Sequence, residues 1–429
     1  MPIEYDLVII GATELGCRMA HRAAQVGARV ALVEQSVTPE PALRYRAAVR
    51  APCPAIPADN RASWLDLKVQ DDALALSAEA LQMAGVDYIA NDGTFVQTPI
   101  HGFQVVDRLL RSSHYLSALQ GDRIVPLGLG NRPTLRPEEI ANQWFDIKGQ
   151  RVAIVGEMLV GVELAMALRS QGADVILVVQ TSHLLPKVNR AFGDRVQMAL
   201  EVAGVEVWTG QSYESKPIRD RIAECNTVVL ATPMVKLSPE CFGLRSLNRS
   251  MMKQNRLRLV THSDDLTDNT SALAHVWIER ILKPWSRRTI KPSSGHLAGL
   301  AAAWVHSPIA PSKKQSPPQN TIDLQGVSLD EGRLWYFVSV TQTGRIIAAY
   351  FVGNQAMEWS ALFSVAIAAK MSFPDLPSLA LPNPTQSALA AQWLYEWERQ
   401  ALLPWHEFFL DWLGFVRRRS IVKPPSSIR

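Results

Sequence analysis

Residues 5–34 read YDLVIIGATELGCRMAHRAAQVGARVALVE, and residues 150–179 repeat the same order of features as QRVAIVGEMLVGVELAMALRSQGADVILVV. In each stretch an apolar run typical of a buried parallel strand leads through a glycine-bearing turn into a helix. A closing glycine and a second strand follow. A strand, helix and strand joined in this way open a nucleotide-binding domain. The sequence therefore predicts an α/β fold with two Rossmann-like dinucleotide-binding domains.

The composition is that of a globular chain with room for about three domains. Of its 429 residues, 47% are hydrophobic and 20% are charged. The net charge of +4 is too small to indicate a nucleic-acid partner. No uninterrupted apolar stretch reaches the roughly 18 residues of a membrane span. The N-terminus carries no signal-peptide pattern, so the expected compartment is the cytoplasm.

The cysteine spacing argues against two common kinds of site. The four cysteines are Cys17, Cys53, Cys225 and Cys241. No two of them are separated by two or four residues, as a metal knuckle or a local redox dithiol requires. We therefore expect no metal site.

The first glycine turn departs from the dinucleotide fingerprint at its middle position. Gly11 and Gly16 keep the outer glycines of G-x-G-x-x-G, while Thr13 replaces the glycine that lets the backbone approach a pyrophosphate. Glu34 stands where a ribose-binding carboxylate is expected. Glu14 begins the helix, where its carboxylate could fill the anion site itself. The turn indicates the fold strongly and FAD binding weakly.

The second glycine turn has lost the same residue. Gly156 and Gly161 are the outer glycines, and Met158 occupies the middle position, where its side chain would enter the phosphate space. The second strand ends at residues 180–183, which supply neither a carboxylate for a ribose 2′-hydroxyl nor an arginine for a 2′-phosphate. We interpret this unit as a packed domain whose crevice is blocked to NAD(P)H, with retained binding as the alternative.

The rest of the chain predicts a third, α+β domain and a helical extension. Two hairpin-like strands at 334–340 and 345–352 flank a turn, and an alanine-rich helix follows at 356–370. The expected division is a discontinuous first domain (1–148 and 268–307), a second domain (149–267), a linker (308–320), a third domain (321–390) and an extension (391–429).

With these motifs placed, residues 4–390 resemble the pyridine nucleotide–disulfide oxidoreductases, which include dihydrolipoamide dehydrogenase, mercuric reductase and glutathione reductase. The two glycine turns are similar to the FAD and nicotinamide openings of that family. The resemblance implies that the third domain is a dimerisation domain and that the protein is a homodimer. Further segments similar to the family lie at 184–186, 203–207, 344–349, 352–353 and 383–385.

The chemistry of that family is incomplete in this chain. The redox pair of the family is a Cys-x4-Cys just after the first βαβ unit, and that interval holds Cys53 alone. The His–Glu acid/base pair of the family is replaced by Asn383 and Ala388, neither of which can transfer a proton. We therefore predict that disulfide, lipoamide and mercuric-ion reduction by the family mechanism is excluded, and we assign no catalytic residue.

Three further positions of the family pattern can be compared. Glu163, near the flavin in relatives, is kept, and it could persist only for local packing. Alignment on Thr270 places Arg280 at the position of the flavin-side aspartate, which inverts the charge. In addition, Pro233 replaces the glycine of the central Ala-Thr-Gly turn.

Beyond the family-like region an aromatic stripe recurs at a spacing close to four, ahead of the basic residues 417–419. One interpretation is that it packs onto the protein's own core or dimer interface. The other is a docking helix, within 391–429, for a protein partner or an anionic membrane surface. The stripe consists of Leu389, Trp393, Trp397, Ala401, Trp405, Phe409, Trp412 and Val416.

Two functions are compatible with these observations. The first is a non-catalytic or redox-reassigned member of the fold that acts as a scaffold, assembly or regulatory subunit. The second is an FAD- and NAD(P)H-dependent oxidoreductase of non-disulfide type, which needs no cysteines because hydride transfer needs only the two cofactors.

Overall fold

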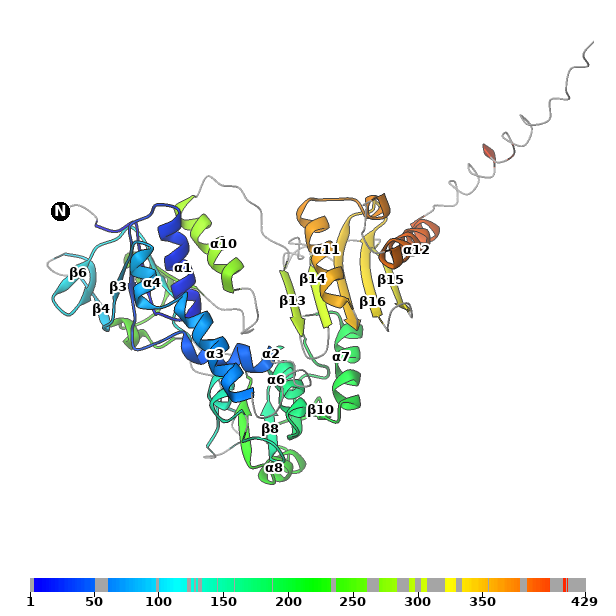
Figure 1. The fold of residues 1–429 in the computed structure, drawn as a ribbon, viewed down its shortest axis with the longest axis horizontal. Helices are drawn as coiled ribbons and strands as arrows, with labels where there is room; N and C mark the ends of the chain where they lie inside the picture. Colours follow the sequence, from blue (N-terminus) through cyan, green and yellow to red (C-terminus); the bar gives the residue numbers. More distant parts are fainter. Residues whose placement is uncertain are drawn as a thin grey trace, which may run out of the picture. The chain divides into compact units, whose positions relative to one another are not determined.

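Three main sheets organise the chain in the computed structural model (Figure 1). By contacts the chain divides into two units, 1–289 with 297–300 and 290–296 with 301–429, which are described separately. The described residues are 4–50, 61–97, 100–121, 125–126, 129, 133–144, 146–157, 159–186, 188–232, 237–260, 270–283, 293–297, 302–306, 321–328, 334–353, 355–378, 384–401, 412–413 and 415.

The first sheet is parallel, with strand order β12-β7-β1-β2-β3. Its strands are β1 (Leu7–Ile10), β2 (Val30–Val33), β3 (Val86–Ile89), β7 (Tyr115–Ser117) and β12 (Leu257–Leu259). Its helices include α1 (Glu14–Gln25), α2 (Glu40–Arg50), α3 (Arg61–Leu74), α4 (Ala78–Met83) and α10 (Thr270–Leu282). Helices α1 and α10 pack against each other, as Figure 1 also shows. β1, α1 and β2 form the predicted first βαβ unit.

A small antiparallel sheet packs on the first one. It contains β4 (Gly93–Val96), β5 (Gly102–Val105) and β6 (Arg108–Leu110). Phe95 and Phe103 from this sheet share one buried cluster with Tyr115 of β7. The ring of Phe95 lies 5.0 Å from that of Phe103 and 5.1 Å from that of Tyr115, both edge-on. This aromatic contact joins the two sheets because edge-to-face rings add to the energy of burial.

The second parallel sheet has the order β10-β9-β8-β11 and confirms the second βαβ unit. Its strands are β8 (Arg151–Val155), β9 (Asp174–Val178), β10 (Glu206–Trp208) and β11 (Thr227–Leu230). The helices of this region are α5 (Pro137–Ile140), η3 (Ala141–Gln143), α6 (Leu159–Ser170), α7 (Arg190–Val202) and α8 (Lys216–Ala223). The later η4 (Pro239–Phe242) and α9 (Arg249–Gln254) contact β4 and β12 instead. Helix α6 is buried along most of its length, as expected of a helix between β8 and β9.

The second unit is built on a five-stranded sheet of order β13-β14-β17-β16-β15. Its elements are β13 (Ser293–Leu297), β14 (Ala302–His306), β15 (Thr321–Ser328), β16 (Leu334–Thr341), β17 (Ile346–Gly353), α11 (Ala356–Ala368), η6 (Phe373–Ser378) and α12 (Pro384–Ala401). β16 and β17 are the predicted hairpin and α11 is the predicted helix.

Two expected domain boundaries are displaced. β12 was expected in the second domain, within 149–267, but it pairs with β7 in the first sheet. β14 was expected in the first domain, within 268–307, but it pairs with β17 in the third sheet. Each of these strands is only three to five residues long. The sheet that each strand joins is decided by pairing with a strand far away in the sequence. A local sequence pattern does not predict such pairing. The expected linker, 308–320, lies outside the described residues.

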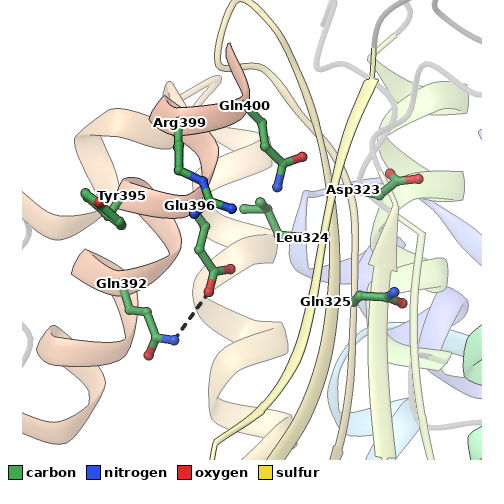
Figure 2. A pocket seen from close by; sticks show the side chains of 8 residues that line it. All are labelled: Asp323, Leu324, Gln325, Gln392, Tyr395, Glu396, Arg399 and Gln400. Carbon is green, nitrogen blue, oxygen red and sulfur yellow. Dashed lines mark hydrogen bonds between the residues drawn. The ribbon is translucent and has the colours of Figure 1, made fainter. Parts of the chain in front are cut away.

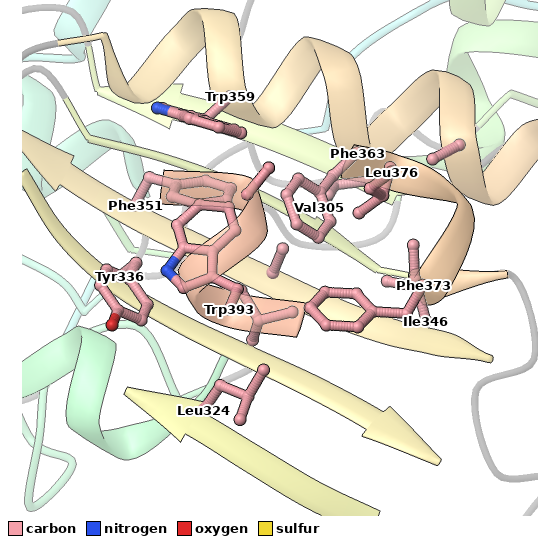
Figure 3. Packing of buried hydrophobic residues seen from close by; sticks show 14 of the residues in the cluster. Val305, Leu324, Tyr336, Ile346, Phe351, Trp359, Phe363, Phe373, Leu376 and Trp393 are labelled. Carbon is pink, nitrogen blue, oxygen red and sulfur yellow. The ribbon is translucent and has the colours of Figure 1, made fainter. Parts of the chain in front are cut away.

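The aromatic stripe of α12 packs onto the sheet of its own unit. Trp393 is fully buried, with its ring 4.6 Å from Trp359, 4.9 Å from Tyr336 and 5.8 Å from Phe363 (Figure 3). Leu389 is buried in the same cluster, and Trp397 and Ala401 pack against it. The own-core interpretation is therefore confirmed as far as residue 401.

Little of the stripe beyond residue 401 is described. Trp405, Phe409 and Val416 lie outside the described residues, and Trp412 is 49% exposed. Among the described residues, no helix is both long and apolar enough to cross a membrane.

The position of Trp393 leads to a stability prediction. Trp393→Ala should destabilise the protein by about 3–5 kcal/mol, because it removes the central ring of a packed cluster and leaves a cavity. Chemical denaturation followed by tryptophan fluorescence and circular dichroism measures the loss. Val365→Ala on α11 is the control, because Val365 is 64% exposed and its truncation should change stability by less than about 0.5 kcal/mol. Equal effects of the two substitutions would contradict this account of the core.

Candidate functional site

The outer glycines of the first turn are required by packing alone. Gly11 has φ +105°, and a Cβ there would lie 2.7 Å from Leu119 Cδ2. A Cβ at Gly16 would lie 2.0 Å from the Gly11 carbonyl oxygen, so α1 approaches β1 more closely than any other residue would allow. Both glycines thus have a structural role whether or not a dinucleotide binds.

Thr13, in place of the middle glycine, caps α1. Its hydroxyl accepts a hydrogen bond from the Gly16 N–H at 3.1 Å and donates one to the Ala118 carbonyl at 3.0 Å. Thr13 is 5% exposed. An N-cap hydroxyl satisfies an N–H group that would otherwise be unpaired at the start of the helix, where phosphates bind. The side chain that departs from the fingerprint is therefore an integrated part of the turn.

Glu14 holds a buried carboxylate at the same helix start. Its side chain is 3% exposed. Arg46 of α2 contacts both of its oxygens, at 2.5 Å for Nη1 to Oε1 and through Nη2 to Oε2. Arg18 Nε and Thr270 Oγ1 lie 2.8 and 2.9 Å from Oε1. One carboxylate thus joins α1, α2 and α10.

The charges around Glu14 keep it ionised. Burial disfavours a carboxylate, but the charge and hydrogen bonds of Arg46 and Arg18 outweigh it, and the pKa of Glu14 lies below its usual value. Burial, and then the negative charge of Glu14, raise the pKa of Cys17 to about 12. Cys17 is therefore a protonated, unreactive thiol at neutral pH.

Glu34 lies at the end of β2, as predicted. It is half-buried and accepts a hydrogen bond from the Tyr88 hydroxyl at 3.2 Å. Burial, and then the neighbouring Glu34 carboxylate, raise the pKa of Tyr88. The residue has the position and chemistry of a ribose-binding carboxylate, and its contact with β3 also gives it a structural role.

The outer glycines of the second turn are also required by packing. Gly156 has φ +143°, and a Cβ there would lie 2.3 Å from the Ala231 carbonyl oxygen, while one at Gly161 would lie 2.8 Å from the Gly156 oxygen. Leu159, the first residue of α6, is 2% exposed. Glu163 is half-buried within α6, and Met158 lies outside the described residues.

The polar side chains after β9 contact one another. The Thr181 hydroxyl donates to the His183 carbonyl at 2.8 Å, and the Ser182 hydroxyl lies 3.2 Å from His183 Nδ1. Such groups could hydrogen-bond a ribose, but none of them carries a fixed charge that would select NAD or NADP.

Arg280, which aligns with the flavin-side aspartate of the family, lies within a helix. Residues 270–282 form α10, a continuous helix whose buried apolar residues Ala274, Ile278 and Ile281 recur at helical spacing. The Arg280 guanidinium carbon lies 6.0 Å from the centre of the Trp277 ring on the same helix. Alignment on the Thr-Ser pair failed because that pair begins a helix here.

The positions of the family's proton- and electron-transfer groups are only partly described. Asn383 and Cys53 lie outside the described residues, and Ala388 is an exposed residue of α12. Cys17 and Cys225 are buried free thiols, and Cys241 is an exposed one.

The sequence pattern did not predict Arg46 and Thr270, which complete the Glu14 site. One signal was available: a carboxylate placed in a buried glycine turn needs a cation. Arginines at 44, 46 and 50 follow on the next helix. The sequence does not show which of them points inward.

Comparisons with known proteins agree with this fold. Residues 128–235 match the family model described as pyridine nucleotide-disulphide oxidoreductase. A curated glutathione reductase from Nostoc sp. is 24% identical over 234 residues, 48% of this chain and 49% of that protein, so the match spans about half the length of the relative.

The HOCl-induced flavoprotein disulfide reductase RclA from Escherichia coli has a similar structure. It superposes with a TM-score of 0.67 at 15% identity, covering 90% of this chain and 99% of that one. Its Cu(II) complex has the same TM-score and identity and is covered to 98%. The resemblance inferred from the glycine turns is confirmed.

The buried carboxylate predicts a pH-dependent stability. Because the folded-state pKa of Glu14 is depressed, its contribution is present above the unfolded value of roughly 4.3 and is lost as the pH falls through the folded value. Glu14→Gln should therefore be most destabilising near pH 7, and its difference from wild type should shrink below pH ~4. Urea denaturation at several pH values measures this. A difference that stays constant with pH would contradict the ion-pair account.

Arg46 and Arg44 provide a matched comparison on α2. Arg46→Met should cost about 3 kcal/mol, because it leaves the buried Glu14 carboxylate undercompensated. Arg44 pairs with the exposed Asp66 at 2.9 Å, so Arg44→Met should cost at most about 1 kcal/mol. Denaturation midpoints at pH 7 distinguish the two, and a larger effect for Arg44→Met would overturn the assignment.

Proposed function

The chain has the fold, and over residues 128–235 the sequence signature, of the pyridine nucleotide–disulfide oxidoreductase family, and we propose that it is a non-catalytic or redox-reassigned member. It acts as a scaffold, assembly or regulatory subunit and not by dithiol–disulfide exchange. Its expected compartment is the cytoplasm.

The observation that carries this proposal is the buried Glu14 carboxylate. A dinucleotide binds a Rossmann-like domain with its pyrophosphate at the start of the first helix. Glu14 occupies this helix start, and the Arg46 guanidinium that could neutralise a phosphate contacts both Glu14 oxygens. Bringing in a second anion would require the carboxylate to leave or to be protonated. The residues present therefore fit an internal anion and not FAD.

The missing redox groups support the same conclusion. Cys53 has no partner cysteine at the Cys-x4-Cys spacing of the family. Asn383 and Ala388 stand at the positions of the family's His–Glu acid/base pair. A dithiol and a proton-transfer pair are separate parts of one mechanism. The absence of both favours loss of the reaction over a change in its substrate.

A second candidate is an FAD- and NAD(P)H-dependent oxidoreductase of non-disulfide type. Glu34 favours it, because this carboxylate stands at the end of β2, where a ribose would be bound. Glu163 within α6 is also kept. Bound flavin and nicotinamide would supply hydride transfer without cysteines.

The same proposal includes the partners. Proteins of this family are typically homodimers, and we expect one here. The aromatic stripe of α12 packs into the core of its own unit over residues 389–401. We therefore propose that residues 402–429 are the part that docks to a protein or an anionic membrane surface. No nucleic acid is expected at a net charge of +4.

Flavin content tests the proposal directly. The purified full-length protein should show little flavin absorbance, and added FAD should bind weakly, because Glu14 would compete for Arg46. Glu14→Ser removes the internal anion and frees Arg46, so it should bind FAD more tightly than wild type in a fluorescence titration. Glu34→Ser is the control, because it removes a carboxylate without freeing Arg46 and should not gain affinity. A stoichiometric wild-type flavin that NADH or NADPH bleaches would end the proposal and favour the second candidate.

Truncation tests the tail separately. Removing 402–429 should leave the denaturation midpoint unchanged and abolish association with a partner or with anionic vesicles. Removing 391–429 should also unfold the second unit, because Trp393 is lost. Unchanged association after the shorter truncation would refute docking through the tail.

A further inference from the structure

One stretch of the first unit carries fixed positive charges without any carboxylate. Between Glu240 and Asp264 the sequence holds no aspartate or glutamate, but it holds five lysine or arginine residues. All five are exposed, and none makes an ion pair with a described residue. These residues, which we call the basic segment, are Arg245, Arg249, Lys253, Arg256 and Arg258.

The apolar residues that alternate with these cations face the core. Leu244 and Leu257 are buried in the cluster that contains Phe95, Phe103 and Tyr115. Three further apolar residues of the stretch pack against this cluster, namely Leu247, Met251 and Leu259. The apolar side chains therefore attach the stretch to the protein, and the basic side chains are left at the surface.

Hydrogen bonds fix the backbone that carries the cations. At the start of α9, Asn248 accepts a hydrogen bond from the Met251 N–H at 2.9 Å. Just after α9, Asn255 is fully buried, and its amide oxygen lies 2.7 Å from Gln97 Nε2 and 3.1 Å from His101 Nε2. A partner that binds to a backbone already held in place does not have to order it. The surface is therefore preformed.

The like charges of the basic segment do not stabilise the fold. Arg249 and Lys253 are four residues apart on α9, so two side chains of the same sign are neighbours on the helix. Like charges at this spacing destabilise a helix slightly. Four other helices of the first unit instead pair a base with an acid at this spacing, at residues 14 and 18, 40 and 44, 68 and 72, and 190 and 194.

Arg256 and Arg258 extend the positive surface toward β7. Burial, and then the positive charges of Arg258 and Arg256, lower the pKa of His114, the residue before β7. Arg256 Nη1 donates a hydrogen bond at 3.5 Å to the carbonyl of Ser112, which is a neutral acceptor. The contacts of these arginines with the described residues therefore leave their charges uncompensated.

The polar groove of the second unit has a different character. It has a volume of about 560 Å³ and lies between β15 and α12 (Figure 2). Asp323 and Glu396 line it together with Arg399, so both signs of charge are present. Mixed charges are usual on the surface of a soluble protein, whereas a surface of one sign attracts partners of the opposite sign. The basic segment is a surface of one sign.

The residue types of the basic segment favour an acidic polypeptide as the partner. Among residues 241–260 no large apolar side chain is exposed, which disfavours insertion into a membrane. Phe242 is the one aromatic residue there, and it is fully buried, so no ring is available to stack on a nucleic-acid base. Four of the five cations are arginines, which bind carboxylates through two parallel hydrogen bonds.

We propose that the basic segment docks an acidic segment of a protein partner. Its neighbouring cations are one helical turn or two strand residues apart, which separates them by about 6–7 Å. Alternate side chains of an extended chain recur at about the same distance. Carboxylates at every second position of the partner therefore match the spacing of the cations. This surface lies in the first unit, so the inference goes beyond the docking proposed for residues 402–429.

Charge reversal on α9 tests the proposal in the full-length protein. The probe is a fluorescein-labelled decaglutamate peptide, and its anisotropy during titration with the protein gives the dissociation constant. Combined Arg249→Glu and Lys253→Glu should raise this constant by about ten- to thirtyfold, because two attractions become two repulsions. Combined Arg249→Gln and Lys253→Gln should raise it by about threefold. Added sodium chloride should weaken the binding of the wild type.

Helix α8 provides the matched control. Lys216 and Arg219 are exposed, lie three residues apart on α8 and make no ion pair with a described residue. Combined Lys216→Glu and Arg219→Glu change the net charge by the same amount as the reversal on α9. Because salt screens charges that do not contact the peptide, this control should raise the constant by less than about twofold. All four reversed side chains are exposed, so both reversals should keep the denaturation midpoint of the wild type.

Three results would overturn the proposal. One is a wild-type protein that does not bind the peptide, and another is equal weakening by the reversals on α9 and α8. The third is an oligonucleotide, or vesicles of phosphatidylserine, that bind more tightly than the peptide and lose affinity on reversal of α9. The basic residues 417–419 are present in every variant, so they do not cause a difference between variants. None of these results depends on flavin content, so failure here is distinguishable from failure of the proposed function.

Discussion

The buried ion pair between Glu14 and Arg46 is the contact on which the packing around the first glycine turn depends. A buried carboxylate is costly unless cations and hydrogen bonds compensate it, and here two arginines and a threonine do so. The contact joins α1 to α2 and α10, so it both holds three helices together and occupies the helix start at which a pyrophosphate would bind. One interaction thus links the packing of three helices to the place where a dinucleotide would bind.

Close packing between helices and strands explains why the glycine turns remain recognisable. Gly11, Gly16, Gly156 and Gly161 each sit where a Cβ would meet backbone or core atoms, so the fold retains them without a ligand. At the middle position of the first turn, Thr13 serves as a helix cap. A glycine fingerprint in a sequence can therefore record close helix–strand packing by itself.

The second unit is stabilised by apolar contacts and not by a buried ion pair among its described residues. Its sheet is held by an aromatic cluster around Trp393, and α12 contributes to this core while its adjacent side borders the edge strand β15. One helix thus stabilises the unit and also places polar side chains beside the edge strand.

The sequence by itself determined the two βαβ units, the β16–β17 hairpin, α11 and the missing redox groups, because hydrophobic periodicity, turn residues and single substitutions are local properties. It also placed Thr13, Glu14 and Glu34 correctly at strand and helix ends. Only the tertiary structure decided that Arg46 and Thr270, 32 and 256 residues from Glu14, complete its site, that β12 returns to the first sheet, and that residues 270–282 form a helix against α1. Those contacts depend on which side chains and strands meet in space, and no local pattern encodes a meeting across such separations.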